Sequence, residues 1–210
     1  MNVASKIALQ KKQILEELLE QVPFEGWVES ALELACLKLG FDKNYGDLLF
    51  PRGLTEIVAM FWESLDLQML EQAQLLPLGQ MKIRERIFVL TKLHMSLTLL
   101  PRNLLQKTLA FYQKPSYRLE FMKLMWNTAS HIWYRAGDKS TDYNYYTKRL
   151  LLLKLYSSSL TYLNNDQSDE YQDSWRLLNS KIEETIKMGQ LPGKIARALK
   201  NLPFIRLLRS

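Results

Sequence analysis

The chain of 210 residues has one cysteine, two histidines, eight glycines and seven prolines. Cys36 alone can form neither an internal disulfide nor a thiolate zinc site, and we expect it to be a small buried hydrophobe. So few glycines and prolines leave few turns to connect strands. The longest charge-free stretches fall well short of the roughly 20 apolar residues that a membrane-spanning helix needs. These shortages favour a mostly helical protein without a transmembrane segment.

Signatures of catalysis are missing as well. The sequence has no His-Glu-x-x-His, Gly-x-Ser-x-Gly, P-loop or Gly-x-Gly-x-x-Gly motif. The Glu-x-x-His pairs of helical di-iron sites do not occur either. His94 lies on the apolar stripe of a predicted helix, which favours a hydrogen-bonded core histidine over a metal ligand. We therefore expect a protein that is not an enzyme, with no catalytic residue, no metal site and no cofactor.

Apolar residues recur at helical spacing along the chain. The pattern predicts helices over residues 4–21, 26–39, 83–97, 101–113, 115–135, 142–164 and 168–189, with another that begins near Leu54. Gly46 and Pro51 limit a further element between them to about a turn and a half. Neither a repeat nor strand-like alternation appears. The expected fold class is all-α, with about nine helices plus an amphipathic C-terminal helix.

Two of the predicted helices, 115–135 and 142–164, are apolar on more than one face. One interpretation is that they lie buried at the centre of a helical bundle. The other is that they wall an apolar cavity, shaped by adaptable methionine and aromatic side chains. Periodicity does not separate these interpretations. The side chains that would line such a cavity include Met122, Met125, Trp126, Leu152 and Leu153.

The net charge of +6 is concentrated at the C-terminus. The last twenty residues have five cations and no acid, which leaves +1 for residues 1–190. Beyond a hinge at residues 190–193, apolar and basic side chains fall on opposite faces of a helix. This pattern predicts an interfacial helix on anionic lipid, although a terminal helix docked on the protein body is the alternative. The predicted membrane-binding residues are Ile195, Leu199, Leu202, Phe204, Lys194, Arg197 and Lys200.

The first fifty residues have the helix pattern of a helix-turn-helix. A DNA-reading helix and its surroundings are normally basic. Residues 24–53 instead contain five acidic and three basic side chains, a net charge of −2. Because phosphate neutralisation supplies most non-specific affinity for DNA, we expect no nucleic-acid partner.

The most specific stretch is Ala-Gly-Asp-x-Ser-Thr-Asp-x-Asn-x-Tyr-Thr-Lys-Arg at residues 136–149. It resembles the ubiquinone-biosynthesis accessory lipid-binding family, whose members share the fold of TetR-type repressors and have lost DNA binding. Trp27, the Phe-Pro-Arg-Gly turn at 50–53, Ile83-Arg84 and Asp166-x-Ser168 also match the family. The resemblance extends from about residue 10 to the tail.

The resemblance implies that the protein binds isoprenoid quinone intermediates and phospholipid in an apolar cavity. It would present the quinone to the di-iron demethoxyubiquinone hydroxylase. Arg149 would contact a lipid head group, while Asp142, Tyr145 and Tyr146 would contact the hydroxylase. Tyr145 stands where a tryptophan is usual in the family. We also expect a homodimer.

The resulting division gives residues 1–52 as a helix-turn-helix-like part, 53–189 as a lipid-binding bundle and 190–210 as hinge and membrane helix. The early acidic residues Glu16, Glu17 and Glu20 are unlike a transit peptide. We therefore expect a peripheral protein on the cytoplasmic face of a bacterial inner membrane, or on the matrix side in a processed mitochondrial protein. A TetR-type, ligand-responsive transcriptional regulator remains the alternative function.

Overall fold

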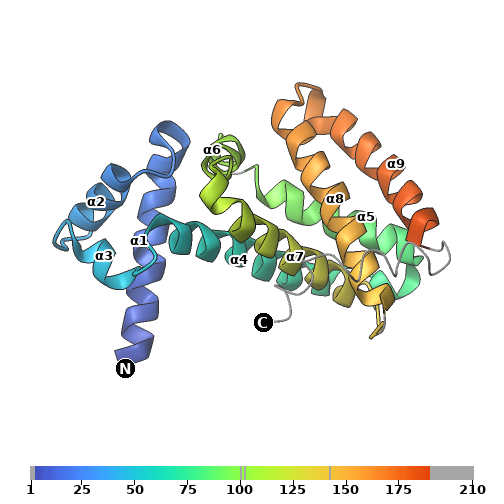
Figure 1. Ribbon diagram of the computed structural model, residues 1–210, viewed down its shortest axis with the longest axis horizontal. Coiled ribbons are helices and arrows are strands. Elements are labelled where there is room, and N and C mark those ends of the chain that lie inside the picture. The colour runs from blue at the N-terminus through green and yellow to red at the C-terminus, as the bar shows by residue number, and fades with distance from the viewer. Residues whose placement is uncertain (1–2, 100, 102, 142, 190–210) are drawn as a thin grey trace. The chain divides into compact units, whose positions relative to one another are not determined.

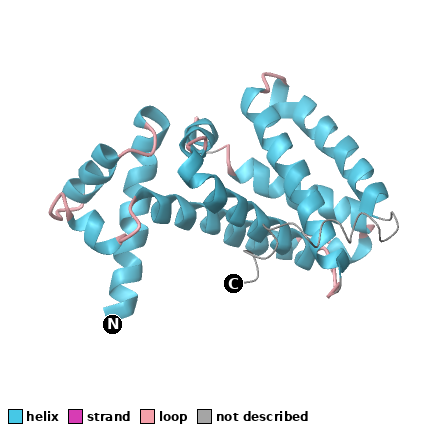
Figure 2. Cartoon of the chain, viewed as in Figure 1, coloured by secondary structure: helices cyan, strands magenta, loops and turns pink. Residues whose placement is uncertain are grey.

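The computed structural model describes residues 3–99, 101, 103–141 and 143–189 (Figure 1). Every regular element within these ranges is a helix (Figure 2), which confirms the all-α prediction. The nine α-helices of the described residues are α1 (Val3–Glu25), α2 (Glu29–Lys38), α3 (Tyr45–Leu49), α4 (Leu54–Gln72), α5 (Ile83–Leu97), α6 (Leu104–Tyr112), α7 (Arg118–Arg135), α8 (Tyr143–Asn165) and α9 (Gln172–Gly189). Short 3₁₀ turns connect several of them. The predicted C-terminal helix lies outside the described residues.

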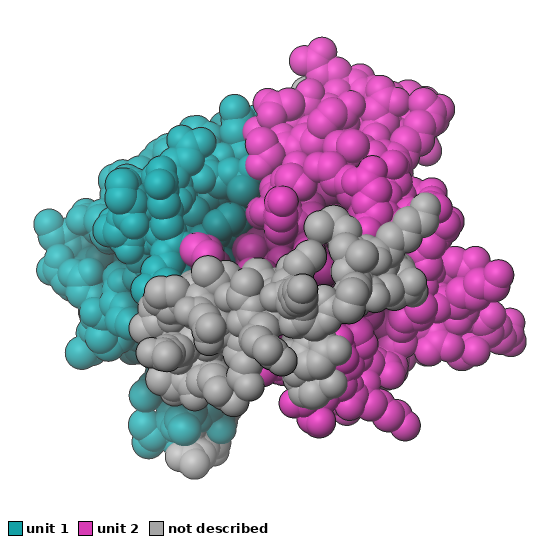
Figure 3. Space-filling model, turned by 45° about the vertical axis from the view of Figure 1, so that its right-hand side comes forward, with its two compact units in different colours: residues 1–65, 96–121 teal, residues 66–95, 122–210 magenta. Residues whose placement is uncertain are grey.

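The chain forms two compact units, which Figure 3 distinguishes by colour. Unit 1 consists of residues 1–65 and 96–121, and unit 2 consists of residues 66–95 and 122–210. Helices α4, α5 and α7 each contribute residues to both units. These units are defined by packing, whereas the sequence-based boundary between residues 52 and 53 concerns expected roles and stays a prediction.

In unit 1, α1 packs against α2, α3 and α6. Ile14 and Leu18 of α1 are fully buried, and so is Cys36 of α2, as the sequence predicts for a lone apolar thiol. Helix α3 has five residues, which confirms the expected turn and a half. A Cβ atom on Gly46 would lie 2.9 Å from Cγ of Leu32, so glycine at this position permits the close approach of α3 to α2.

A tryptophan between α1 and α2 joins α6 to the N-terminal helices. The indole Nε1 of Trp27 donates a hydrogen bond of 3.0 Å to Oγ1 of Thr108 on α6. The Thr108 hydroxyl in turn donates to the carbonyl oxygen of Leu104. The Trp27 ring also contacts Phe61 of α4, with ring centroids 5.6 Å apart. The polar atoms of this buried contact are therefore satisfied, as interior packing requires.

In unit 2, α8 and α9 pack against each other. Their apolar faces bury Leu152 and Leu160 of α8 together with Leu178 and Ile182 of α9. His94 of α5 is fully buried, and its Nδ1 lies 2.5 Å from the hydroxyl oxygen of Tyr156. The prediction of a hydrogen-bonded core histidine is confirmed. Unit 2 also contains the turn between α7 and α8, where the most specific sequence stretch lies.

Candidate functional site at the turn between α7 and α8

Helix α7 ends in a glycine turn that fixes the position of Asp138. Gly137 has a φ of 97°, a conformation that side chains disfavour. The N–H groups of Gly137 and Asp138 donate to the carbonyl oxygens of Tyr134 and Trp133, respectively. These bonds satisfy carbonyl groups at the end of the helix. The guanidinium of Arg86 on α5 donates to the carbonyl oxygen of Ala136 at 3.1 Å, which ties the turn to a third helix.

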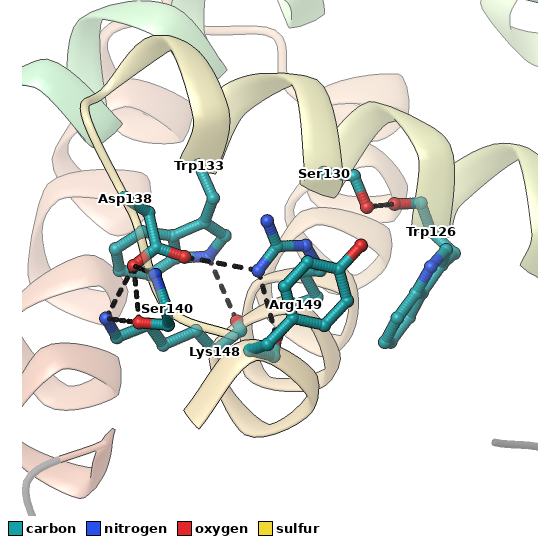
Figure 4. Close-up of polar contacts among 8 residues, drawn as sticks. Trp126, Ser130, Trp133, Asp138, Ser140, Lys148 and Arg149 are labelled. Atoms are coloured by element: carbon teal, nitrogen blue, oxygen red, sulfur yellow. Dashed lines mark hydrogen bonds and ion pairs between the residues drawn. The ribbon is translucent and has the colours of Figure 1, made fainter. Parts of the chain in front are cut away.

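The carboxylate of Asp138 is the centre of a polar network (Figure 4). Its Oδ1 accepts hydrogen bonds of 2.7 Å from Nζ of Lys148 and from Oγ of Ser140. Its Oδ2 accepts from Nη1 of Arg149 at 3.2 Å. The Asp138 side chain is 3% exposed, and a buried carboxylate needs partners of this kind. The hydroxyl of Ser140 donates to Asp138 and accepts a hydrogen bond from Nζ of Lys148 at 2.8 Å.

The network sets the protonation state of Asp138. Burial acts to raise the pKa of this carboxyl, but the hydrogen bonds from Lys148 and Ser140 outweigh burial and hold the pKa below its ordinary value. Asp138 is therefore ionised at neutral pH. Two cations share this one carboxylate, so the group has a net charge of +1. Lys148 also lies over the ring of Trp133, 5.3 Å from its centroid.

An aromatic cluster adjoins the network on the first turns of α8. The guanidinium carbon of Arg149 lies 3.4 Å from the ring centroid of Tyr145, and Nη1 donates to the Tyr145 carbonyl oxygen at 3.0 Å. The spacing of four residues places these side chains on one helix face. Tyr145 and Tyr146 have ring centroids 5.1 Å apart, and both rings pack against Trp126 of α7.

The structure places the predicted site residues as follows. Arg149 is buried and paired with Asp138, whereas Tyr145 and Tyr146 are half-buried. Asp142 and the seven predicted membrane-binding residues lie outside the described residues. Four of the other predicted lipid-binding residues are buried, namely Met125, Trp126, Leu152 and Leu153. The fifth, Met122, is exposed. Burial agrees with either a bundle core or a cavity wall, so their role stays a prediction.

An open groove lies elsewhere, on unit 1. It has a volume of about 680 Å³ and is lined by Ile7, Lys11, Tyr45, Leu48, Leu49, Pro51, Arg52 and Glu56. None of the predicted lipid-binding residues belongs to this set. The groove therefore adds no support to their assignment.

Asp138 has no predicted role, although it lies within the most specific stretch of the sequence. The signal was present in the two adjacent cations ten and eleven residues further along the chain, at Lys148 and Arg149. The two cations identify Asp138 as their partner only in the folded protein, because the turn at Gly137 brings its carboxylate next to the second turn of α8. In the described part of the chain, no group of three or more potential metal ligands forms, and no helix is long and apolar enough to cross a membrane.

The architecture is that of the TetR-like all-α proteins. The TetR transcriptional regulator of Nitrosomonas europaea is similar in structure, with a TM-score of 0.67 over 85% of this chain and 99% of that chain. The two sequences are 13% identical, so this similarity concerns the fold alone.

Sequence comparison identifies the family. A family model described as COQ9 matches residues 119–189, a range that contains α8, α9 and nearly all of α7. The proteins named ubiquinone biosynthesis protein COQ9, mitochondrial, from Homo sapiens and Rattus norvegicus are 26% and 30% identical, each over 84% of this chain. The Schizosaccharomyces pombe relative is 26% identical over 89% of the chain and 74% of its own length. The chain belongs to the COQ9 family, and it spans 58% and 59% of the human and rat proteins.

Proposed function

We propose that this chain is a non-enzymatic accessory protein of ubiquinone biosynthesis. It binds an isoprenoid quinone intermediate together with phospholipid and presents the quinone to the di-iron demethoxyubiquinone hydroxylase. The observation that carries the proposal is the family match over residues 119–189, which contains the whole Asp138 network and the adjoining aromatic cluster. The names of the matched relatives place those proteins in ubiquinone biosynthesis.

The hydroxylase contact is proposed for Tyr145 and Tyr146, together with Asp142. Both tyrosines are half-buried against Trp126, so their rings are held in place while part of each stays accessible. Preordered aromatic side chains lose little conformational entropy on binding and are frequent anchors of protein interfaces. The exposed side chains of Met122 and Tyr134 on α7 supply further apolar surface in unit 2.

The phospholipid contact is proposed for Arg149, whose guanidinium would have to bind the head group in the presence of its partner Asp138. The Arg149 guanidinium already pairs with Asp138 inside the protein, so an anionic head group must share or replace that carboxylate. Lys148 is 30% exposed and holds the other carboxylate oxygen. The net positive charge of these three side chains favours an anion at this position, and a guanidinium suits a phosphate well.

The membrane contact is proposed for residues 190–210, from their sequence alone. An acid-free segment with apolar residues opposite Lys194, Arg197 and Lys200 suits an anionic bilayer surface. This attachment would hold the protein peripherally on the inner membrane of a bacterium or on the matrix side in a mitochondrion. A quinone with a long isoprenoid tail is dissolved in the membrane, so its carrier needs such a contact.

Reconstitution tests the proposal. Purified hydroxylase receives demethoxyubiquinone in anionic liposomes, with and without this chain. We expect the initial rate of hydroxylation to rise with added chain until the two proteins are equimolar, and no turnover by the chain alone. A rate that does not respond to the chain would contradict a role in presentation.

A transcriptional regulator is the second candidate, because a TetR regulator has a similar structure. The charge of residues 24–53 and the five-residue length of α3 oppose DNA reading, since a recognition helix needs base contacts in a basic setting. Sequence-selective retardation of DNA at low salt would favour this candidate over the first.

A further inference from the structure

Four polar side chains lie in the core of unit 2, on two helices. Thr91 and His94 belong to α5, and Tyr156 and Ser159 belong to α8. None of the four is more than 1% exposed. Within each helix the two residues are three positions apart, so they share one face within a single turn. We call these four residues the polar seam. Polar groups are costly inside an apolar core unless they are hydrogen-bonded, so the seam requires an explanation.

Half of the seam belongs to a chain of polar contacts that ends in a carboxylate. Nε2 of His94 lies 3.0 Å from Oδ1 of Asp66 on α4, which is also buried. On the other side of the imidazole ring, Nδ1 shares a hydrogen bond with the Tyr156 hydroxyl. Burial, and after it the charge of Asp66, raise the pKa of Tyr156 well above its ordinary value. The phenol is therefore neutral and fixed in orientation.

The other half of the seam consists of hydroxyls that have no hydrogen-bond partner in the described part of the chain. These are Oγ1 of Thr91 and Oγ of Ser159, both completely shielded from solvent. The buried hydroxyl of Thr108 in unit 1 shows the usual arrangement, because it both donates and accepts. An unsatisfied buried hydroxyl destabilises a fold. Two of them, each one turn from the fixed pair of His94 and Tyr156, indicate a place where an oxygen-bearing group is to be bound.

We infer that the polar seam binds the oxygenated ring of a quinone or phenol ligand, with the hydroxyls of Thr91 and Ser159 donating hydrogen bonds to the ring oxygens. This inference rests on the proposed function and deepens it, since it assigns the ring to particular residues. Leu90 and Leu160, fully buried next to the seam in sequence, supply apolar surface for the carbon frame. An isoprenoid tail has no hydrogen-bonding group. The seam therefore distinguishes the ring from the tail.

Two near-isosteric substitutions test the inference. Thr91→Val and Ser159→Ala each remove a hydroxyl that bonds to no other described residue. Affinity is measured by calorimetry for two probes, a ubiquinone with one isoprenoid unit and farnesene, an isoprenoid hydrocarbon that has neither a ring nor an oxygen atom. We expect each substitution to weaken quinone binding by about fivefold or more and to leave farnesene binding unchanged. Because an unsatisfied hydroxyl disappears, the melting temperature of the ligand-free variants stays the same or rises.

Thr108→Val is the matched control. Its hydroxyl bonds to Trp27 and Leu104 in unit 1, so this variant should melt at a lower temperature and bind the quinone normally. Unchanged quinone affinity in both Thr91→Val and Ser159→Ala would overturn the inference and leave the hydroxyls as sites for buried water. A clear fall in their melting temperature would overturn it as well. Wild-type protein that binds neither probe would contradict the proposed function itself.

Discussion

The guanidinium of Arg149 and the carboxylate of Asp138 form an ion pair inside the protein, with Nη1 3.2 Å from Oδ2 and side chains 5% and 3% exposed. The two residues are eleven positions apart, with Asp138 in the turn between α7 and α8 and Arg149 on α8. A buried ion pair adds little net stability over an apolar pair, but removing one partner leaves an uncompensated charge in the interior. The stability of the turn therefore depends on keeping both charges.

Replacing Asp138 by asparagine should destabilise the protein strongly. The change preserves shape but leaves Arg149 and Lys148 without their counter-charge. We expect the free energy of unfolding in urea to fall by roughly 3 kcal/mol. Asp173→Asn is the control, because Asp173 pairs with Arg176 on the surface, with side chains 50% and 75% exposed, and an exposed pair contributes about 0.5 kcal/mol or less. Equal effects of the two substitutions would mean that the Asp138 network does not hold the turn.

The same carboxylate predicts a dependence of stability on pH. The pKa of Asp138 is lower in the folded protein than its ordinary value of 3.8, so below pH 4 the unfolded chain binds the proton first. The contribution of Asp138 is complete at neutral pH and is lost as the pH falls through the folded-state pKa. The difference in urea midpoint between wild type and Asp138→Asn should therefore shrink between pH 5 and pH 2. A difference that stays constant over this range would contradict the assignment.

Tyr146→Ala should separate partner binding from ligand loading. If Tyr146 anchors the hydroxylase, its removal weakens the complex by about 2 kcal/mol, measured by surface plasmon resonance with immobilised hydroxylase. Quinone loading should stay the same. Tyr145→Phe is the control, because a phenyl ring still accepts the Arg149 guanidinium. Parallel loss of hydroxylase binding and quinone loading in Tyr146→Ala would show that this tyrosine supports the fold instead.

Neutralising the tail should release the protein from anionic membranes. The variant changes Lys194, Arg197 and Lys200 to glutamine. At about 1 kcal/mol per cation near the surface, binding to anionic liposomes should weaken by roughly hundredfold. Co-sedimentation with liposomes measures this loss of binding. The difference in binding between the wild type and the variant should decrease as salt is added.

A second triple variant controls for overall charge. It replaces three exposed lysines of the body, Lys6, Lys43 and Lys154, by glutamine and lowers the net charge by the same amount. We expect this variant to bind liposomes as the wild type does. If both variants lose binding equally, attachment depends on net charge and the tail has no special role.

Sequence patterns predicted much of the fold because its causes are local. Helical spacing of apolar residues predicted the helices, and the breakers Gly46 and Pro51 predicted the short α3. Cys36 and His94 were also predicted correctly as interior residues. In each case the neighbours along the helix determine which face is buried.

The candidate site was predicted less completely because its contacts depend on tertiary structure. The resemblance predicts that Arg149 contacts a lipid head group, whereas its pairing with Asp138 depends on the turn between α7 and α8. The partners of His94 were equally hidden, since Asp66 and Tyr156 lie 28 and 62 positions away. A pattern of spacing identifies a buried polar residue, but only the packing of three helices shows what satisfies it.

Native mass spectrometry of the full chain, purified from a ubiquinone-producing bacterium, tests the central claim most directly. The spectrum, combined with analysis of the organic extract, should show bound isoprenoid quinone or its precursor together with phospholipid. The mass of the intact complex also tests the expected homodimer. Asp173→Asn should carry the same lipids, as its surface ion pair is remote from the α7–α8 turn in sequence. Folded wild-type protein that releases neither quinone nor phospholipid would contradict the account.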